Sequence, residues 1–108
     1  MTRNEKVAAK LGLKLHLDNK WQLYIHEITA YLDDFGTDTP SGHWLAHLLI
    51  ERMRQDGWHV HASFISDQQV HLGAFDTKLQ KWEFADKPDF PAAVVELFVK
   101  VYAIPDGE

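Results

Sequence analysis

The chain has 108 residues, of which 45% are hydrophobic, 25% charged and 12% aromatic, a composition that excludes disorder and fibrous repeats and suits one domain over residues 1–108. It contains no cysteine, which excludes disulfides, cysteine-built zinc sites and thiol nucleophiles. A formal net charge of −5 argues against direct nucleic-acid binding through the phosphate backbone.

The sequence has no pattern typical of export or of a membrane span. Arg3 and Glu5 interrupt the N-terminal apolar stripe, whereas a signal peptide needs about 7–15 apolar residues in a row. The longest mainly apolar stretch, residues 92–104, contains Glu96 and Lys100 and is shorter than the roughly 20 residues that cross a bilayer. We therefore expect a cytoplasmic protein that makes no membrane contact.

In the first part of the chain the pattern predicts a short helix and then a strand. Thr2 and Glu5 have the spacing of a capping box, and Gly12 stands where a left-handed residue ends a helix. Residues 20–28 are rich in aromatic and β-branched side chains and predict the first strand. Residues 31–38 then form a polar connection.

A second helix is predicted to begin after Thr39, because Thr39 is a suitable N-cap and Pro40 suits the first helical position. Apolar side chains then recur at helical spacing, at Leu45, Leu48, Leu49 and Met53. Gly57 ends the helix. We expect Leu45, Leu49 and Met53 to pack on a sheet face that carries Val60, Phe64 and Leu72.

Two alternating runs, residues 58–66 and 70–76, predict a β-hairpin with a three-residue loop. An odd loop makes one face entirely apolar, with Trp58, Val60, Ala62, Phe64, Val70, Leu72 and Ala74. The opposite face then carries His59, His61, Ser63 and His71. A two-residue loop would mix the two sets. We prefer the odd loop, because burying an all-apolar face stabilises the fold whereas burying unpaired imidazoles destabilises it.

Residues 78–85 predict a final strand, in which Trp82, like Trp58 earlier, is expected to point into the core. Asp89 can cap a last helix over residues 90–102. The alternation of Val95, Leu97, Val99 and Val101 is also compatible with a strand. The cap, and a proline in the first turn, favour the helix.

The predicted order is therefore helix, strand, helix, three strands, helix: an α+β fold in which helices flank an antiparallel four-stranded sheet as an α-β-α sandwich. The segments EKVAAKLG, WQLY, YLDDFGTD, LIERMRQDGW and FAD resemble the phage ABA-sandwich domain family over nearly the whole chain. That resemblance implies a small phage or prophage protein, and it supports a helix over residues 90–102. It implies no shared catalytic residues.

Histidine is the one over-represented residue type that could indicate chemistry. His43 and His47 lie one helical turn apart, and Glu51 follows one turn later; two imidazoles and a carboxylate at this spacing can bind one metal ion. All three also fall on the polar side of the predicted helix, where solvated residues are expected. We therefore predict no metal site and keep these three residues as the alternative.

His59, His61, His71 and Phe75 share one predicted face of the hairpin and form the candidate binding surface. In the three-residue-loop register His71 lies opposite Ile65, four residues from His61, or about 13 Å along the strand. One metal ion could not contact all three imidazoles across that distance. A surface that meets a partner is the preferred interpretation.

No nucleophile motif, phosphate-binding glycine loop or calcium loop is present in the sequence. We therefore expect no catalytic residues and no cofactor. The favoured function is non-enzymatic binding of a host or phage protein, for example inhibition of a bacterial defence system. The alternative is a metal-dependent hydrolase or another enzyme that uses the histidines. A homodimer and a monomer remain equal alternatives.

Overall fold

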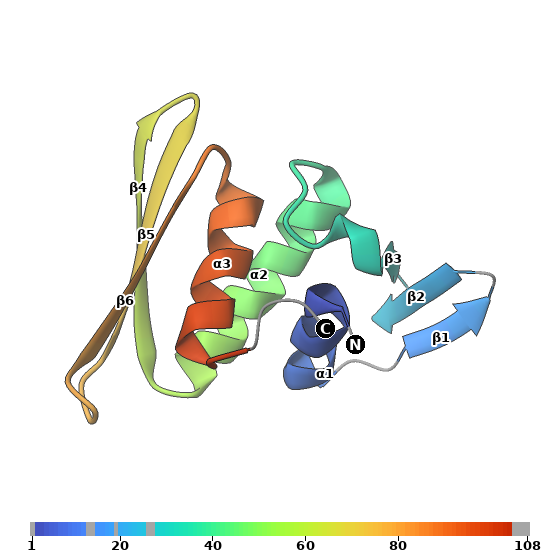
Figure 1. The fold of residues 1–108 in the computed structure, drawn as a ribbon, viewed down its shortest axis with the longest axis horizontal. Coiled ribbons are helices and arrows are strands. Elements are labelled where there is room, and N and C mark those ends of the chain that lie inside the picture. Colours follow the sequence, from blue (N-terminus) through green and yellow to red (C-terminus); the bar gives the residue numbers. More distant parts are fainter. Residues whose placement is uncertain (1, 13–14, 19, 26–27, 105–108) are drawn as a thin grey trace.

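The computed structural model describes residues 2–12, 15–18, 20–25 and 28–104. The elements follow in the order α1 (Arg3–Leu11), β1 (Leu15–Asp18), β2 (Lys20–Ile25), β3 (Ile28–Tyr31), the 3₁₀ turn η1 (Leu32–Asp34), α2 (Pro40–Gln55), β4 (Trp58–Ser66), β5 (Gln69–Asp76), β6 (Lys81–Lys87) and α3 (Phe90–Val101). The strands form two separate antiparallel sheets, β1-β2-β3 and β4-β5-β6, and the helices lie between them (Figure 1).

The α+β class is confirmed, but the single four-stranded sheet is wrong. The predicted strand over residues 20–28 is β2, which is bonded on both sides by its own chain neighbours: Leu23 lies opposite Leu15 in β1 and opposite Ala30 in β3. Residues 26 and 27 lie outside the described residues. Pairing with adjacent segments closes only short loops, which costs less entropy than pairing with a distant strand.

The expected sandwich is also incomplete. Helices α2 and α3 pack on one face of the β4–β6 sheet, and α1 lies on the far side of these two helices (Figure 1). In the described part of the chain the opposite face of that sheet carries no helix. None of the described helices has the length and apolar character needed to cross a bilayer.

The helix ends are confirmed, since each predicted cap makes the expected hydrogen bond. The Thr2 hydroxyl accepts from the Glu5 amide at 3.2 Å, and the Thr39 hydroxyl accepts from the Gly42 amide at 3.0 Å. Asp89 Oδ1 accepts from the Ala92 amide at 2.9 Å. The last segment is therefore helical, because its cap and first-turn proline outweigh the β-branched residues that follow.

The β4–β5 hairpin has the predicted faces but a different register. Ser66 pairs with Gln69 across a two-residue turn, and a register shift between Phe64 and Ser66 leaves Ile65 as an extra residue. This bulge restores the parity that a two-residue turn alone would have reversed. His71 therefore lies opposite Ser63 and not opposite Ile65 as predicted.

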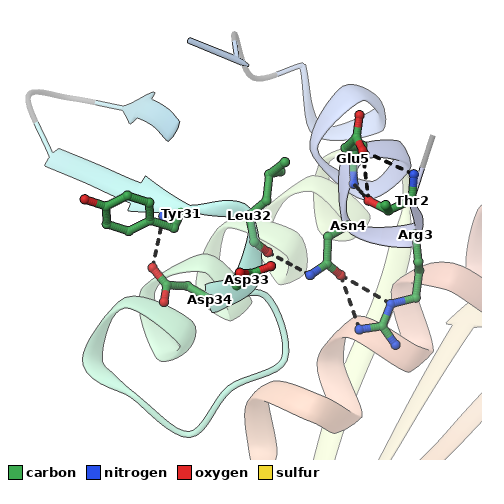
Figure 2. A pocket seen from close by; sticks show the side chains of 8 residues that line it. All are labelled: Thr2, Arg3, Asn4, Glu5, Tyr31, Leu32, Asp33 and Asp34. Carbon is green, nitrogen blue, oxygen red and sulfur yellow. Dashed lines mark hydrogen bonds between the residues drawn. The ribbon is translucent and has the colours of Figure 1, made fainter. Parts of the chain in front are cut away.

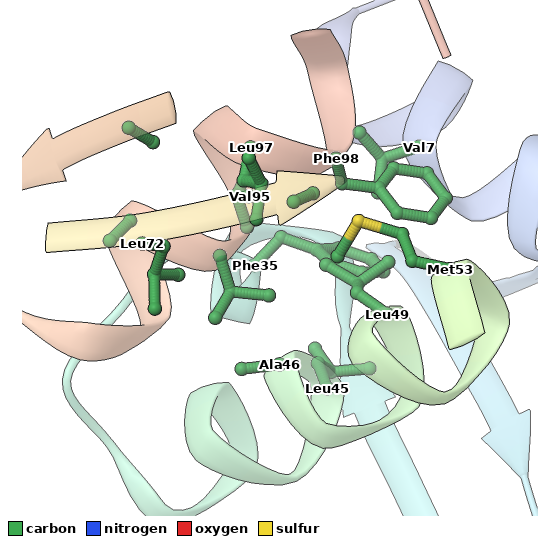
Figure 3. Close-up of a cluster of buried hydrophobic side chains, with 14 of the residues drawn as sticks. Val7, Phe35, Leu45, Ala46, Leu49, Met53, Leu72, Val95, Leu97 and Phe98 are labelled. Carbon is green, nitrogen blue, oxygen red and sulfur yellow. The ribbon is translucent and has the colours of Figure 1, made fainter. Parts of the chain in front are cut away.

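The main core lies between the inner face of the β4–β6 sheet and helices α2 and α3 (Figure 3). Leu45, Leu49 and Met53 of α2 are fully buried, as predicted, and so is Leu72 of β5. Phe64 shares this inner face, but it is 68% exposed and lies against Phe90 with 5.9 Å between ring centroids. Its predicted burial under α2 is wrong, because the hairpin tip extends past the helices (Figure 1).

The final strand begins three residues later than predicted. Asp76 at the end of β5 accepts hydrogen bonds from the amides of Lys78 at 2.9 Å and Leu79 at 3.4 Å. Gln80 then adopts a left-handed backbone with φ 51°. Because an aspartate side chain can hold a turn in this way, residues 78–80 belong to the connection and β6 starts at Lys81.

Candidate functional site

The face of the β4–β6 sheet that points away from α2 and α3 carries the residues predicted to bind a partner. The strand register aligns three cross-strand rows on it: His59, Phe75 and Trp82; His61, Gly73 and Phe84; Ser63, His71 and Asp86. These nine residues are called the outer sheet surface below. The four predicted binding residues, His59, His61, His71 and Phe75, are therefore brought together on one surface.

Stacked aromatic rings run across this surface. The ring of Trp82 lies 4.5 Å from that of Phe75 and 5.7 Å from that of Phe84, centroid to centroid, and the Phe84 ring in turn lies 5.5 Å from the imidazole of His71. Trp82 is 50% and Phe84 43% exposed. Contiguous aromatic area of this kind on a protein surface is typical of contact sites.

Sequence reasoning missed Trp82 and Phe84 as members of the surface. Trp82 was expected in the core, and that prediction is wrong, whereas the same expectation for Trp58 is confirmed by its 7% exposure. The sequence gives no signal for this, because Trp82 and Phe84 alternate with Lys81, Glu83 and Lys87 and the pattern favours burial of the two rings. Their direction is decided by pairing with β5, which places Trp82 opposite Phe75 and leaves Ala85 as the buried residue of the strand.

Gly73 creates the space that lets side chains lie flat on the middle strand. A Cβ atom at this position would be 2.5 Å from Cε1 of His61 and 3.3 Å from Cε1 of Phe84. The His61 ring therefore lies over β5 and meets Trp82 edge-on, with 6.0 Å between ring centroids. Without a side chain at Gly73, rings from both outer strands converge on the centre of the surface.

The third row contains a serine, a histidine and an aspartate side by side on adjacent strands. Nδ1 of His71 and Oδ1 of Asp86 are 2.8 Å apart, which is the orientation that a carboxylate gives to a catalytic imidazole. The hydroxyl of Ser63, however, forms no hydrogen bond with His71 in the structure, and Ser63 and Asp86 are exposed. The pair therefore holds the imidazole in place beside Phe84, and the row lacks an activated nucleophile.

Two of the three alternative metal ligands on α2 have other partners. Nε2 of His43 lies 2.7 Å from Oδ1 of Asp38, and Glu51 accepts from Arg54 at 3.0 Å. His47 is exposed on the same helix. Among the residues that the structure describes, no three histidines, aspartates or glutamates are grouped closely enough to hold a metal ion.

A separate pocket of about 720 Å³ lies between the start of α1 and η1 (Figure 2). Its described lining residues are Thr2, Arg3, Asn4, Glu5, Tyr31, Leu32, Asp33 and Asp34. Most of these polar groups already hold the fold: Asn4 Nδ2 donates to the Leu32 carbonyl at 2.7 Å, and Asp34 accepts from the Tyr31 amide at 3.0 Å. The pocket is therefore a junction between elements rather than a set of free functional groups.

Comparison of the chain with protein-family models, curated proteins and solved structures finds no match. The resemblance to the phage ABA-sandwich domain family stays a prediction from the sequence segments alone.

Proposed function

We propose that this protein is a non-enzymatic binding protein whose contact site is the outer sheet surface. The observation that carries the proposal is the group of stacked rings formed by Phe75, Trp82 and Phe84, of which Trp82 and Phe84 are exposed. Tryptophan and other large side chains at the centre of an interface supply most of its binding energy. The rings lie near the middle strand, as an energetic centre would.

The charge distribution of the surface supports a protein partner. Asp86 is its single acidic residue, it lies on the rim, and no lysine or arginine belongs to the surface. Protein interfaces are likewise depleted of charge at their centre and polar at their rim. A phosphate-rich partner would instead require basic side chains.

The proposed partner is a host or phage protein in the bacterial cytoplasm, and inhibition of a host defence system is one concrete version. Support for this part comes from the sequence resemblance and from the small size of the chain. Such a protein would act by covering a surface of its partner, which requires no catalytic group. Its inhibitory effect would then depend on its affinity for the partner and not on a catalytic rate.

The test compares two variants in which an exposed apolar side chain is truncated to alanine. Trp82→Ala removes the largest ring of the surface, whereas Leu79→Ala removes a 68% exposed side chain in the β5–β6 connection. Each variant, carrying a tag other than polyhistidine, is used to capture proteins from bacterial lysate. We expect a partner retained by wild type and Leu79→Ala and weakened at least tenfold by Trp82→Ala, which corresponds to about 1.4 kcal/mol or more.

Equal capture by all three proteins would remove the outer sheet surface from the function. Urea denaturation of Trp82→Ala serves as the control for folding, because its ring lies on the solvent side of the sheet and contributes little to the core. Loss of capture with an unchanged denaturation midpoint assigns the effect to the surface.

A further inference from the structure

We infer that the edge of strand β4 is a pairing site for a second copy of this chain, with the two β4 strands antiparallel and the two β4–β6 sheets joined into one. This inference does not depend on the proposed function, because an edge contact leaves the outer sheet surface uncovered. It begins from a difference between the two edges of the sheet.

The edge of the sheet at β6 is protected against strand addition in two ways. Four of the residues in this strand are charged: Lys81, Glu83, Asp86 and Lys87. In addition, the Lys100 ammonium donates a hydrogen bond of 2.7 Å to the backbone carbonyl of Phe84. Charged side chains along an edge oppose the addition of another strand, and a lysine on the carbonyl occupies a group that the new strand would use.

The edge at β4 lacks this protection. The strand WHVHASFIS spans Trp58–Ser66 and contains no lysine, arginine, aspartate, glutamate or proline. In the described part of the chain no charged side chain is placed on its backbone as Lys100 is on β6. A long uncharged edge strand is a template for strand addition. The register is regular from Trp58 to Phe64, before the shift at Ile65.

The two ends of this edge differ, since one carries exposed apolar side chains and the other a hollow. At the tip of the hairpin, Phe64 and Ile65 are 68% and 60% exposed. At the root, a hollow of about 410 Å³ is lined by Glu51, Arg54, Gln55, Gly57, Trp58 and His59. An antiparallel pair places the tip of each copy at the root of the other, so that each exposed Phe64 enters the hollow beside Trp58 of the second copy.

Charge also favours this occupant over other contacts between copies. The chain carries a net charge of −5, so most surfaces of two copies repel each other. The β4 edge is uncharged, and the two charged side chains of the hollow, Glu51 and Arg54, are paired at 3.0 Å. Copies can therefore approach here without bringing unpaired like charges together.

The geometry defines one register. Full overlap of the regular segment Trp58–Phe64 with itself puts the two-fold axis at His61, so that Trp58 faces Phe64, His59 faces Ser63 and His61 faces His61 of the second copy. Directly opposite residues in an antiparallel pair have Cβ atoms about 4.5–5.5 Å apart. The Cβ atoms at position 61 therefore lie close together, although the His61 ring itself extends over β5, whereas those at position 63 are separated by four residues, or about 13 Å.

Because the chain has no cysteine, single cysteines can read this register directly. Under mild oxidation we expect His61→Cys to form a covalent dimer, since a small adjustment brings the two sulfurs into bonding distance. Ser63→Cys, on the same face of the same strand, is the matched control and should remain uncrosslinked. Crosslinking of Ser63→Cys as efficient as that of His61→Cys would overturn the proposed pairing.

Light scattering supplies a second measurement that needs no cysteine. The wild-type chain should have twice its 12.5 kDa chain mass at micromolar concentration. Phe64→Lys should reduce this to the single-chain mass, whereas Leu79→Lys, which starts from the same 68% exposure away from the edge, should leave it doubled. Ala62→Lys, at an exposed position on the same edge, replaces Phe64→Lys if that variant has an altered circular dichroism spectrum.

Three results would contradict the edge pairing. The first is a single-chain mass for wild type, and the second is equal loss of the dimer in Phe64→Lys and Leu79→Lys. The third is loss of the dimer in Trp82→Ala with its retention in Phe64→Lys, which would place the contact on the outer sheet surface. Loss of partner capture in Trp82→Ala tests only the proposed function. The dimer mass of this variant should be the same as that of wild type.

Discussion

The hydroxyl of Tyr102 links the C-terminal ends of the two helices beneath the main sheet. It donates to Oδ2 of Asp56 at 2.5 Å, and Nε of Arg52 lies 3.2 Å from the same oxygen. Asp56 caps α2 and Tyr102 caps α3. A carboxylate at a helix C-terminus is unfavourable by itself, so these two donors compensate for the position of Asp56.

The same contacts shift the titration of both acidic groups. The hydrogen bond from Tyr102 holds the pKa of Asp56 below its ordinary value, and Arg52 acts in the same direction against the opposing effect of burial. Burial raises the pKa of Tyr102, and the hydrogen bond to Asp56 adds to that effect. The Tyr102 hydroxyl therefore stays protonated and donates this hydrogen bond throughout the ordinary pH range.

Tyr102→Phe should cost about 1 kcal/mol of stability at neutral pH, because a hydrogen bond to a charged group is lost but the Asp56 side chain is 40% exposed and partly screened. The folded-state pKa of Asp56 is lowered, so its contribution is complete above the ordinary value of 3.8 and disappears as the pH falls through the lower folded value. Urea denaturation of wild type and Tyr102→Phe at neutral and at strongly acidic pH measures the loss of stability and its disappearance in acid. An equal loss at the two pH values would assign the effect to the hydrogen bond of 3.4 Å from the Tyr102 hydroxyl to the Arg52 carbonyl, which does not depend on the charge of Asp56.

Helix α2 shows how one element serves both the core and the edge of the molecule. Its inward side carries Leu45, Leu49 and Met53, all fully buried, while the helix end near β4 carries the ion pair Glu51–Arg54. The apolar spacing of this helix was readable from the sequence because helical periodicity is local. Which sheet it covers depends on contacts with distant strands.

In helix α2 we expect Leu49→Ala to destabilise the fold by roughly 2–5 kcal/mol, the usual range for a fully buried leucine. Leu79→Ala is the exposed control and should change stability by less than about 0.5 kcal/mol. Both are measured by urea denaturation with a constant m-value. A small loss of stability in Leu49→Ala would mean that this side of α2 does not pack against the core.

The histidines connect the outer sheet surface to the charge of the whole molecule. The formal charge of −5 counts all seven histidines as neutral, and imidazoles as a class gain protons between about pH 7.5 and 5.5. His59 and His61 lie next to each other on one face with no carboxylate beside them in their rows, whereas His71 has Asp86 at 2.8 Å. Three of the seven histidines therefore lie where a partner would have to displace water.

We predict that the triple variant His59/His61/His71→Gln binds the captured partner about tenfold more weakly than the wild-type protein, a loss of about 1.4 kcal/mol. The reason is that the imidazoles of His61 and His71 pack against the rings of Trp82 and Phe84. Binding of the captured partner is measured for both proteins. Equal affinities would remove the three histidines from the contact site.

Features governed by neighbouring residues were predictable from the sequence. Thr2, Thr39 and Asp89 cap helices as expected, since a cap depends on groups only three residues away. The two faces of the hairpin were also predictable, because side-chain alternation follows from the strand backbone itself. His59, His61, His71 and Phe75 could therefore be placed on one surface without the structure.

What the sequence could not decide are the pairings between distant segments. The Ile65 bulge moved His71 from Ile65 to Ser63, and β2 joined its chain neighbours in a second sheet instead of the main one. The contact of Tyr102 with Asp56 likewise joins residues 46 positions apart. Local propensity specifies that a segment is a strand or a helix and which way its side chains alternate. Only tertiary packing selects its partners, because many pairings satisfy the same local pattern and the buried core decides among them.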